Sequence, residues 1–235
     1  IIGGINVVDS LIAREVDCGI YLNAGREVGV ASTKSFTSQL LVLSMLAIWF
    51  SQVHELNDAL RTQFIRDMRV LPKQMEDVIS VAKTKLHGHL KMLLKPSMFV
   101  LGKGMMEGIS KEGSLKIKEM AYLHAEGYSG SSLKHGPFAL LQEGVPVIII
   151  INRDEHFHKM QNVYEQVKSR VSSILVLTDD YDVSVKTNGI LYPHNTHYSH
   201  VLCVTLLQYI AYLLATEQGI NPDFPRNLAK VVTVE

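Results

Sequence analysis

The run Val145–Ile151, which reads VPVIIII, places the strongest constraint on how this chain can fold. A continuous apolar run of this length is typical of a strand that is buried on both faces of a sheet. Strands of that kind occur almost only in parallel sheets that carry helices on both sides. The run therefore predicts an α/β protein whose parallel sheets are flanked by helices.

Other segments fit the same plan. Further candidate strands are Ile1–Asn6, Met98–Leu101, Ile174–Leu177 and Ile190–Tyr192. Apolar residues recur at a spacing near 3.6 residues, which predicts helices, in Thr33–Gln52, Glu107–Leu123, Asp154–Arg170 and His200–Gln218. Alternation of strands and helices implies parallel sheets joined by right-handed crossovers.

The stretch Glu55–Leu94 contains no strand-like run and separates two units. It is predicted to form two helices, the second of which begins at Pro72, because proline suits the first turn of a helix. We therefore expect a first unit over residues 1–70, a connecting helix over 71–94 and a second unit over 95–235.

Composition narrows the partners and the compartment. The chain has 23 basic and 23 acidic residues and no block of like charge, which argues against nucleic acid or a membrane surface as the main partner. The apolar run Leu40–Phe50 is too short to span a bilayer. Cys18 and Cys203 are interpreted as small core residues in a reducing, cytoplasmic compartment. Because the chain opens abruptly on the apolar run IIGGI, we expect it to be a piece of a longer protein.

Glu112, Lys116 and Glu119 follow one another at i, i+4 and i+7, so on a helix they share one face. This spacing puts a cation beside carboxylates. His135 then adds an imidazole in the turn-prone sequence KHGP. A base, an amine and an imidazole together suit proton transfer on a sugar. From spacing alone the alternatives stay open: solvated helix carboxylates paired with lysines, and a structural histidine.

Three blocks together carry a family resemblance. They are EGSLKIKE followed by LKHGP over residues 112–137, NAGREVGVASTK over 23–34, and FPRNLAK followed by VVTVE over 224–235. In this order they resemble the isomerase part of the glutamine–fructose-6-phosphate aminotransferase family, which makes glucosamine 6-phosphate. The resemblance implies two sugar isomerase (SIS) domains. Of these, only the second half of the first would be present, and the second would be complete with a catalytic C-terminal tail.

The resemblance also implies roles for individual residues. Glu119 would be the base that moves a proton between C1 and C2 of the sugar, and Lys116 would stabilise the developing negative charge or keep Glu119 ionised. Glu112 would bind substrate and orient Lys116. His135 would open the sugar ring from the neighbouring subunit, which requires at least a dimer. Lys230 would form a Schiff base with the open-chain sugar.

Residues Val30, Ala31, Ser32 and Thr33 are predicted to open a helix, where N–H groups and hydroxyls can bind a sugar. The resemblance implies that Val30, Ala31 and Ser32 bind the substrate, as does Ala229 beside the tail lysine. A plain N-cap explains the same residues about as well, and that alternative stays open.

Parts of the family pattern are missing or altered. The serine- and threonine-rich phosphate loop of the S-x-S-G-E-T type and the C-G-[TS]-S segment do not occur, and both would precede Ile1. A glutamine-hydrolysing domain is likewise expected upstream. The family's A-G-E before LKHGP is Gly130-Ser131-Ser132 here, and Lys111 replaces a small apolar residue.

The expected partners are therefore a small sugar phosphate and a second copy of the chain. No cofactor is predicted, and no metal, because the other histidines show no ligand spacing. Three hypotheses remain open: the isomerase part of a glucosamine-6-phosphate synthase, a SIS-type module that binds a sugar phosphate without catalysis, and a structural half of a dimer.

Overall fold

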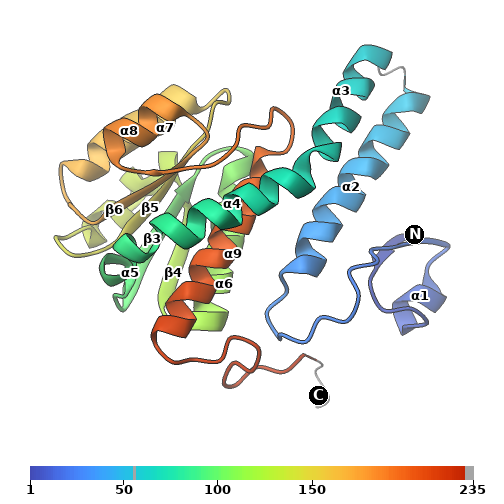
Figure 1. The fold of residues 1–235 in the computed structure, drawn as a ribbon, viewed down its shortest axis with the longest axis horizontal. Coiled ribbons are helices and arrows are strands. Elements are labelled where there is room, and N and C mark those ends of the chain that lie inside the picture. Colours follow the sequence, from blue (N-terminus) through green and yellow to red (C-terminus); the bar gives the residue numbers. More distant parts are fainter. Residues whose placement is uncertain (55–56, 231–235) are drawn as a thin grey trace.

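Two parallel sheets organise the chain in the computed structural model, which describes residues 1–54 and 57–230 (Figure 1). The strands are β1 (Ile2–Ile5), β2 (Cys18–Tyr21), β3 (Ser97–Gly102), β4 (His124–Ser129), β5 (Val147–Ile151), β6 (Ile174–Thr178) and β7 (Ile190–Leu191). The α-helices are α1 (Leu11–Glu15), α2 (Lys34–Val53), α3 (Asp58–Arg69), α4 (Leu71–Lys85), α5 (His87–Leu93), α6 (Met105–Ala121), α7 (Phe157–Lys168), α8 (Tyr181–Thr187) and α9 (Ser199–Glu217). Two 3₁₀ turns are η1 (Gly130–His135) and η2 (Pro137–Leu140).

The larger sheet has the strand order β4-β3-β5-β6-β7, and all four pairings are parallel. Its central strand β5 is the core of the apolar run that the sequence singled out, and all five of its residues are buried. Val147 pairs with Phe99 of β3 on one side and with Ile174 of β6 on the other. The prediction of a strand buried on both faces is confirmed.

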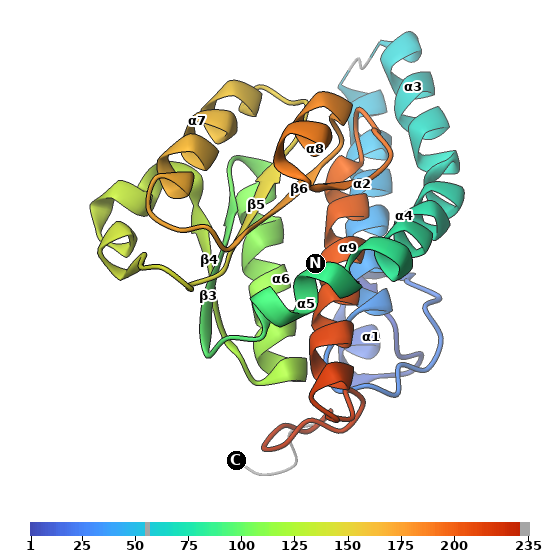
Figure 2. The ribbon, with the colours of Figure 1, turned by 60° about the vertical axis from the view of Figure 1, so that its left-hand side comes forward.

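Side chains of this sheet alternate between two hydrophobic cores, as the pleat of a strand requires. Val100 and Ile148 face the first core, to which α4, α5, α6 and α9 contribute. Leu101 and Ile149 face the second core, which is closed by α7, α8 and the turn η1. The result is a three-layer α/β arrangement, with helices on both faces of the sheet (Figure 2).

Helix α9 lies against α6, and this close packing depends on Gly113. A Cβ atom added at Gly113 would stand 2.6 Å from Cδ1 of Leu207. Both α9 and α2 are long and apolar enough to cross a membrane by length and composition alone. Burial accounts for α9, because 72% of its most apolar window is inside the protein, whereas only 11% of the corresponding window of α2 is buried.

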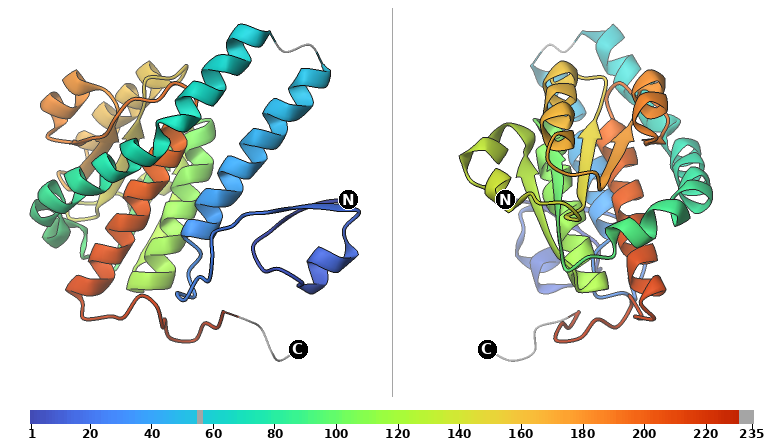
Figure 3. Two further views of the ribbon diagram at one scale, coloured as in Figure 1. Left: turned by 45° about the vertical axis from the view of Figure 1, so that its right-hand side comes forward. Right: turned by 90° about the vertical axis from the view of Figure 1, so that its left-hand side faces the viewer.

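The N-terminal unit is much smaller than the rest. It consists of β1 and β2, which pair in parallel, and of α1 and α2, and it stands to one side of the large sheet (Figures 1 and 3). Large apolar side chains of α2 are exposed, among them Leu43, Trp49 and Val53. A sheet of two strands is too small to be stable alone. This unit therefore has too small a sheet to be stable by itself.

Three details differ from the sequence-based expectations. Strands β2 and β4 were not foreseen, because their sequences CGIY and HAEGYS contain glycine or charge and are only partly buried. The stretch between the units forms the three helices α3, α4 and α5 instead of two, although Pro72 does lie in the first turn of α4. Cys203 is buried as expected, but the prediction for Cys18 was wrong, because β2 leaves that side chain exposed. Glu55 and Leu56, which open the predicted stretch, lie outside the described residues.

Candidate active site

Helix α6 gathers the three charged residues that the sequence placed on one face. Lys116 Nζ lies 2.6 Å from Oε2 of Glu119 and 3.4 Å from Oε1 of Glu112. The Lys116 side chain is only 2% exposed, so its ammonium group is buried between two carboxylates. The predicted side-by-side arrangement is therefore present, and it is a buried ion cluster instead of a solvated helix face.

Burial also affects the carboxylates of this cluster. Burial raises the pKa of Glu112, the positive charge of Lys116 opposes that shift, and the negative charge of Glu119 adds to it. Oε1 of Glu112 and Oε2 of Glu119 are themselves buried, and among the described residues their one cationic partner is Lys116. The cluster therefore depends on Lys116 to balance two carboxylates.

The second group of site residues forms where the C-terminal tail meets the block at residues 23–34. Lys230 Nζ donates hydrogen bonds to Oε2 of Glu27 at 2.7 Å and to the carbonyl of Gly29 at 2.9 Å. The carbonyl of Val30 lies at 3.5 Å. These contacts join two segments about two hundred residues apart in sequence, and they place the predicted Schiff-base lysine beside the predicted sugar-binding loop.

Glu27 organises this junction, and the sequence reasoning did not assign it a role. Burial by itself would raise the pKa of Glu27. Hydrogen bonds from Lys230, Thr33 and Ser35 outweigh burial and lower the pKa to about 2. The sequence did contain one signal for this role. Glu27 belongs to the block over residues 23–34 and lies shortly before a predicted helix, and a carboxylate there suits the positive end of that helix.

The start of α2 shows how Glu27 acts locally. The N-cap residue Thr33 makes no side-chain capping bond. Instead, Oε1 of Glu27 accepts hydrogen bonds from the backbone N–H of Thr33 at 2.9 Å and of Ser35 at 3.3 Å. Ser32 and Ser35 are hydrogen-bonded to each other, and their hydroxyls also reach Glu27. The side chain of Thr33 therefore does not cap α2, and the capping group comes from Glu27.

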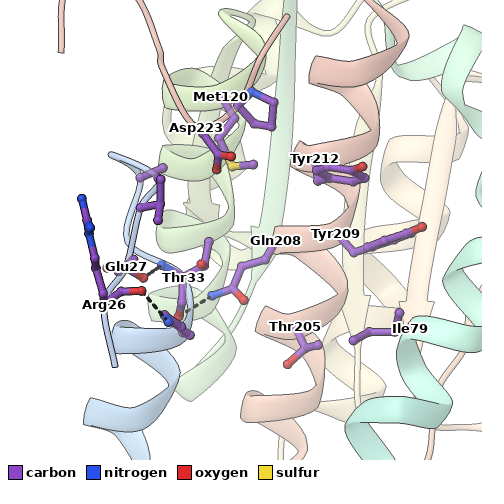
Figure 4. Close-up of a pocket in the computed structure, with 15 residues that line it drawn as sticks. Arg26, Glu27, Thr33, Ile79, Met120, Thr205, Gln208, Tyr209, Tyr212 and Asp223 are labelled. Atoms are coloured by element: carbon purple, nitrogen blue, oxygen red, sulfur yellow. Dashed lines mark hydrogen bonds between the residues drawn. The ribbon is translucent and has the colours of Figure 1, made fainter. Parts of the chain in front are cut away.

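Two neighbouring cavities adjoin this junction. One, of about 670 Å³, is lined by both Ser32 and Lys230, together with Glu27. The other, of about 480 Å³, is lined by Ala31 and also by Glu27 (Figure 4). Figure 4 shows Gln208 of α9 reaching the carbonyl of Thr33, a hydrogen bond of 3.3 Å. The loop at residues 23–34, the C-terminal tail and α9 therefore line two cavities that meet at Glu27.

The tail also touches the end of α6. The backbone N–H of Arg226 donates to the Tyr122 hydroxyl at 2.7 Å, and its guanidinium lies 4.4 Å from the centre of the Tyr122 ring. Tyr122 is the residue after α6, three positions beyond Glu119. Met120 of α6 lines the same cavity as Glu27. The C-terminal end of α6 therefore contacts the tail and lines the cavity at Glu27, although no hydrogen bond or ion pair joins the α6 cluster to the Lys230 junction among the described residues.

The remaining predicted residues are placed as follows. Ala229 is exposed beside Lys230 and lines neither cavity. His135 is exposed at the end of η1, whose Leu133 belongs to the second core, so it lies on the opposite side of the sheet from α6. Residues 231–235, which complete the predicted terminal block, lie outside the described part of the chain.

The sequence profile of the SIS domain matches residues 5–49 and 92–217. The chain belongs to the SIS domain family. The first matched segment lies in the N-terminal unit, and the second contains both the α6 cluster and the large parallel sheet.

Individual relatives agree with this assignment. The chain is 44% identical, over its whole length, to a probable glutamine–fructose-6-phosphate aminotransferase of Acanthamoeba polyphaga mimivirus. It is 40% identical, again over its whole length, to glutamine–fructose-6-phosphate aminotransferase 2 of Homo sapiens. The chain spans 39% and 35% of these two proteins, so it is similar to a part of each.

Solved structures give the same result for the fold of this SIS chain. The C-terminal domain of glucosamine-fructose-6-phosphate aminotransferase from Francisella tularensis superposes with a TM-score of 0.88 at 27% identity, covering 95% of this chain and 64% of that one. Glucosamine-6-phosphate deaminase from Thermotoga maritima superposes with a TM-score of 0.75 at 25% identity, covering 98% of this chain and 66% of that one.

Proposed function

We propose that this chain is the isomerase part of a glutamine–fructose-6-phosphate aminotransferase. In the full-length protein it would convert fructose 6-phosphate and glutamine-derived ammonia into glucosamine 6-phosphate. The observation that carries the proposal is the contact of Lys230 with Glu27 and with the carbonyls of Gly29 and Val30. Lys230 lies beside the loop at residues 23–34 and lines the same cavity as Ser32 of that loop. This arrangement supports attack of the Lys230 amine on the carbonyl carbon of a sugar bound in the cavity.

The first chemical step assigned to this chain is Schiff-base formation by Lys230. An ammonium group cannot attack a carbonyl carbon, so Lys230 must lose a proton first. Glu27 is a poor acceptor for that proton, because its pKa is about 2. Sugar binding must therefore separate Lys230 from Glu27, or another group must take the proton. In either case Glu27 is a positioning residue that holds the tail in place before the substrate arrives.

The second step is the proton transfer between C1 and C2, assigned to Glu119. A single carboxylate can remove a proton from one carbon and return it to the neighbouring carbon. Lys116, 2.6 Å away, stabilises the ionised carboxylate and the negative charge that develops on the sugar. Glu112 holds the other side of Lys116 and so orients it.

The assembly and the location belong to the same proposal. His135 lies across the sheet from α6 and is exposed, so we assign it to ring opening in the site of a second copy, which requires at least a dimer. A glutaminase domain upstream and a cytoplasmic location complete the proposal. The two relatives described above are longer than this chain and carry the aminotransferase name, which supports an upstream domain.

The proposal is tested by measuring glucosamine 6-phosphate formation by the full-length protein and two variants. Glu119→Gln and Lys230→Arg are expected to lower kcat by at least about 10²-fold, the range lost when an acid–base group or a nucleophile is removed. Lys118→Gln, one residue before Glu119, is the matched control and should keep wild-type activity. Near-normal activity of Lys230→Arg would contradict the proposal.

A further inference from the structure

Tyr122 has a backbone conformation that is uncommon for a large side chain. It follows the last residue of α6 with φ 58° and ψ 23°, in the left-handed region. At helix ends this region is usually occupied by glycine, and it disfavours bulky residues. The other non-glycine residues with positive φ in the described ranges are all aspartate or asparagine, namely Asp9, Asn23, Asn188 and Asn227. A tyrosine in this conformation therefore calls for a reason in the contacts of its side chain.

The side chain of Tyr122 holds the C-terminal tail at Arg226. The Tyr122 hydroxyl accepts a hydrogen bond from the backbone N–H of Arg226 at 2.7 Å. The guanidinium of Arg226 lies 4.4 Å from the centre of the Tyr122 ring, which is a cation–π contact. These two contacts, here named the Tyr122–Arg226 clasp, join residues 104 positions apart in sequence.

The rest of the described tail has few attachments to the protein. Before the clasp, the carbonyl of Asp223 accepts a hydrogen bond from the backbone N–H of Val30 at 3.4 Å. After the clasp, Lys230 bonds to Glu27. Residues 227–229 between them are exposed, and they make no hydrogen bond or ion pair with any described residue. The clasp is therefore the attachment that directly precedes Lys230.

The clasp matters most when Lys230 leaves Glu27. Schiff-base formation requires a neutral, free amine, so sugar binding that separates Lys230 from Glu27 would also remove the last attachment of the described tail. The clasp would remain, four positions before Lys230. Four residues span at most about 14 Å when fully extended. The amine would thus stay close to the sugar, which raises its effective concentration at the carbonyl carbon.

The clasp also attaches the tail to the helix that carries the proposed base. Tyr122 lies three positions beyond Glu119. Helix α6 is fixed in the first hydrophobic core through Ile117 and Ala121, both of which are fully buried. One rigid helix therefore sets the position of the base and, through the clasp, the position of the tail.

We propose that Tyr122 is a positioning residue for Lys230 during Schiff-base formation. This role rests on the proposed function, because it takes Lys230 as the nucleophile. Tyr122 lines neither of the cavities at Glu27, so it acts on the tail and not on the sugar. Loss of the clasp should accordingly lower kcat and leave the KM for fructose 6-phosphate unchanged.

The test measures, in the full-length protein at saturating fructose 6-phosphate, the rate at which a borohydride-trapped adduct forms on Lys230. Tyr122→Gly removes the clasp, and it should slow adduct formation at least about tenfold. Because glycine suits the left-handed conformation, the unfolding midpoint of this variant should stay near that of the wild type. Tyr122→Phe keeps the ring contact but loses the hydroxyl, so its rate should lie between the two.

Asn188→Gly is the matched control. Asn188 follows α8 in the same left-handed conformation, with φ 51° and ψ 36°, and its side chain is exposed. Helix α8 belongs to the second hydrophobic core, whereas the clasp is at the end of α6 in the first. The control makes the same kind of backbone change away from the tail, and it should leave the rate of adduct formation and the KM at their wild-type values.

Amide hydrogen exchange of the tail peptide that contains Arg226 gives a second readout, which does not depend on activity. In the sugar-free protein this peptide should exchange faster in Tyr122→Phe than in the wild type, because the N–H of Arg226 loses its acceptor. Lys230→Arg should leave the exchange at Arg226 unchanged, since the clasp does not involve Lys230.

The outcomes separate the two proposals. A wild type that forms no adduct on Lys230 would overturn the proposed function and the role of Tyr122 with it. A wild type that forms the adduct, together with an equally fast Tyr122→Gly, would overturn the role of Tyr122 alone. The same conclusion would follow from a tail peptide that exchanges equally fast in Tyr122→Phe and in the wild type.

Discussion

Lys230 Nζ lies 2.7 Å from Oε2 of Glu27, and this contact joins the C-terminal tail to the loop that opens α2. The same carboxylate caps α2 through Thr33 and Ser35. One buried side chain therefore fixes both the start of a helix and the position of the proposed nucleophile. The predictions below follow from this junction, from the α6 cluster and from the packing of α6.

Glu27→Gln should lower stability near neutral pH and remove a pH dependence. Because the folded pKa of about 2 is below the ordinary value of 4.5, Glu27 contributes stability that is fully present above about pH 5 and is lost as the pH falls towards 2. The shift corresponds to at most about 3 kcal/mol. Denaturant unfolding of both proteins between pH 7 and pH 3 should show a difference that shrinks with acid. A difference independent of pH would contradict this account.

Lys116→Met should strongly destabilise the protein. Removing the cation leaves two carboxylates facing each other in a largely buried position, and loss of one partner of a buried ion pair typically costs about 3–5 kcal/mol. Lys111→Met is the matched control, because Lys111 pairs with Glu107 on an exposed part of the same helix at 2.8 Å. That change should cost no more than about 0.5 kcal/mol. Equal losses in chemical denaturation would show that the cluster behaves as a surface pair.

Gly113→Ala and Gly108→Ala should have opposite effects on stability. At Gly113 the new Cβ meets Leu207, so α6 and α9 must move apart at a cost of about 1–3 kcal/mol. At Gly108, on the same helix, nothing lies within 4 Å of the new Cβ. There alanine should stabilise the helix by up to about 1 kcal/mol. Thermal unfolding of the two variants measures both signs.

The proposal that His135 serves a second copy predicts complementation. Glu119→Gln and His135→Ala should each be inactive alone. When the two inactive full-length variants are mixed and allowed to exchange subunits, half of the dimers are hybrids with one intact site, so activity should return to about a quarter of the wild-type value. Mixing that restores no activity, despite subunit exchange seen by native mass spectrometry, would place His135 in the site of its own chain.

Features that depend on residues close together in sequence could be predicted from the sequence. The run in β5 indicated a doubly buried strand because every residue is apolar, and the spacing of Glu112, Lys116 and Glu119 indicated a shared helix face. Strand β4 could not be predicted from its sequence HAEGYS, because this strand lies at the edge of the sheet and is only partly buried. Its pairing with β3 is a property of the fold and not of its own composition.

The role of Glu27 was hidden for a related reason. A carboxylate before a helix is compatible with many structures, and only the folded chain brings Lys230 to it from a distant segment. Pairing between residues far apart in sequence leaves no periodic signal in a single chain.

The central claim is that Lys230 forms a covalent bond with the sugar, and reductive trapping tests it most directly. The full-length protein is incubated with fructose 6-phosphate, reduced with borohydride and analysed by peptide mass spectrometry. The account predicts a stable hexose phosphate adduct on Lys230, which is absent when the sugar is omitted and absent in Lys230→Arg. No adduct in an active enzyme, or an adduct on another lysine that persists in Lys230→Arg, would contradict it.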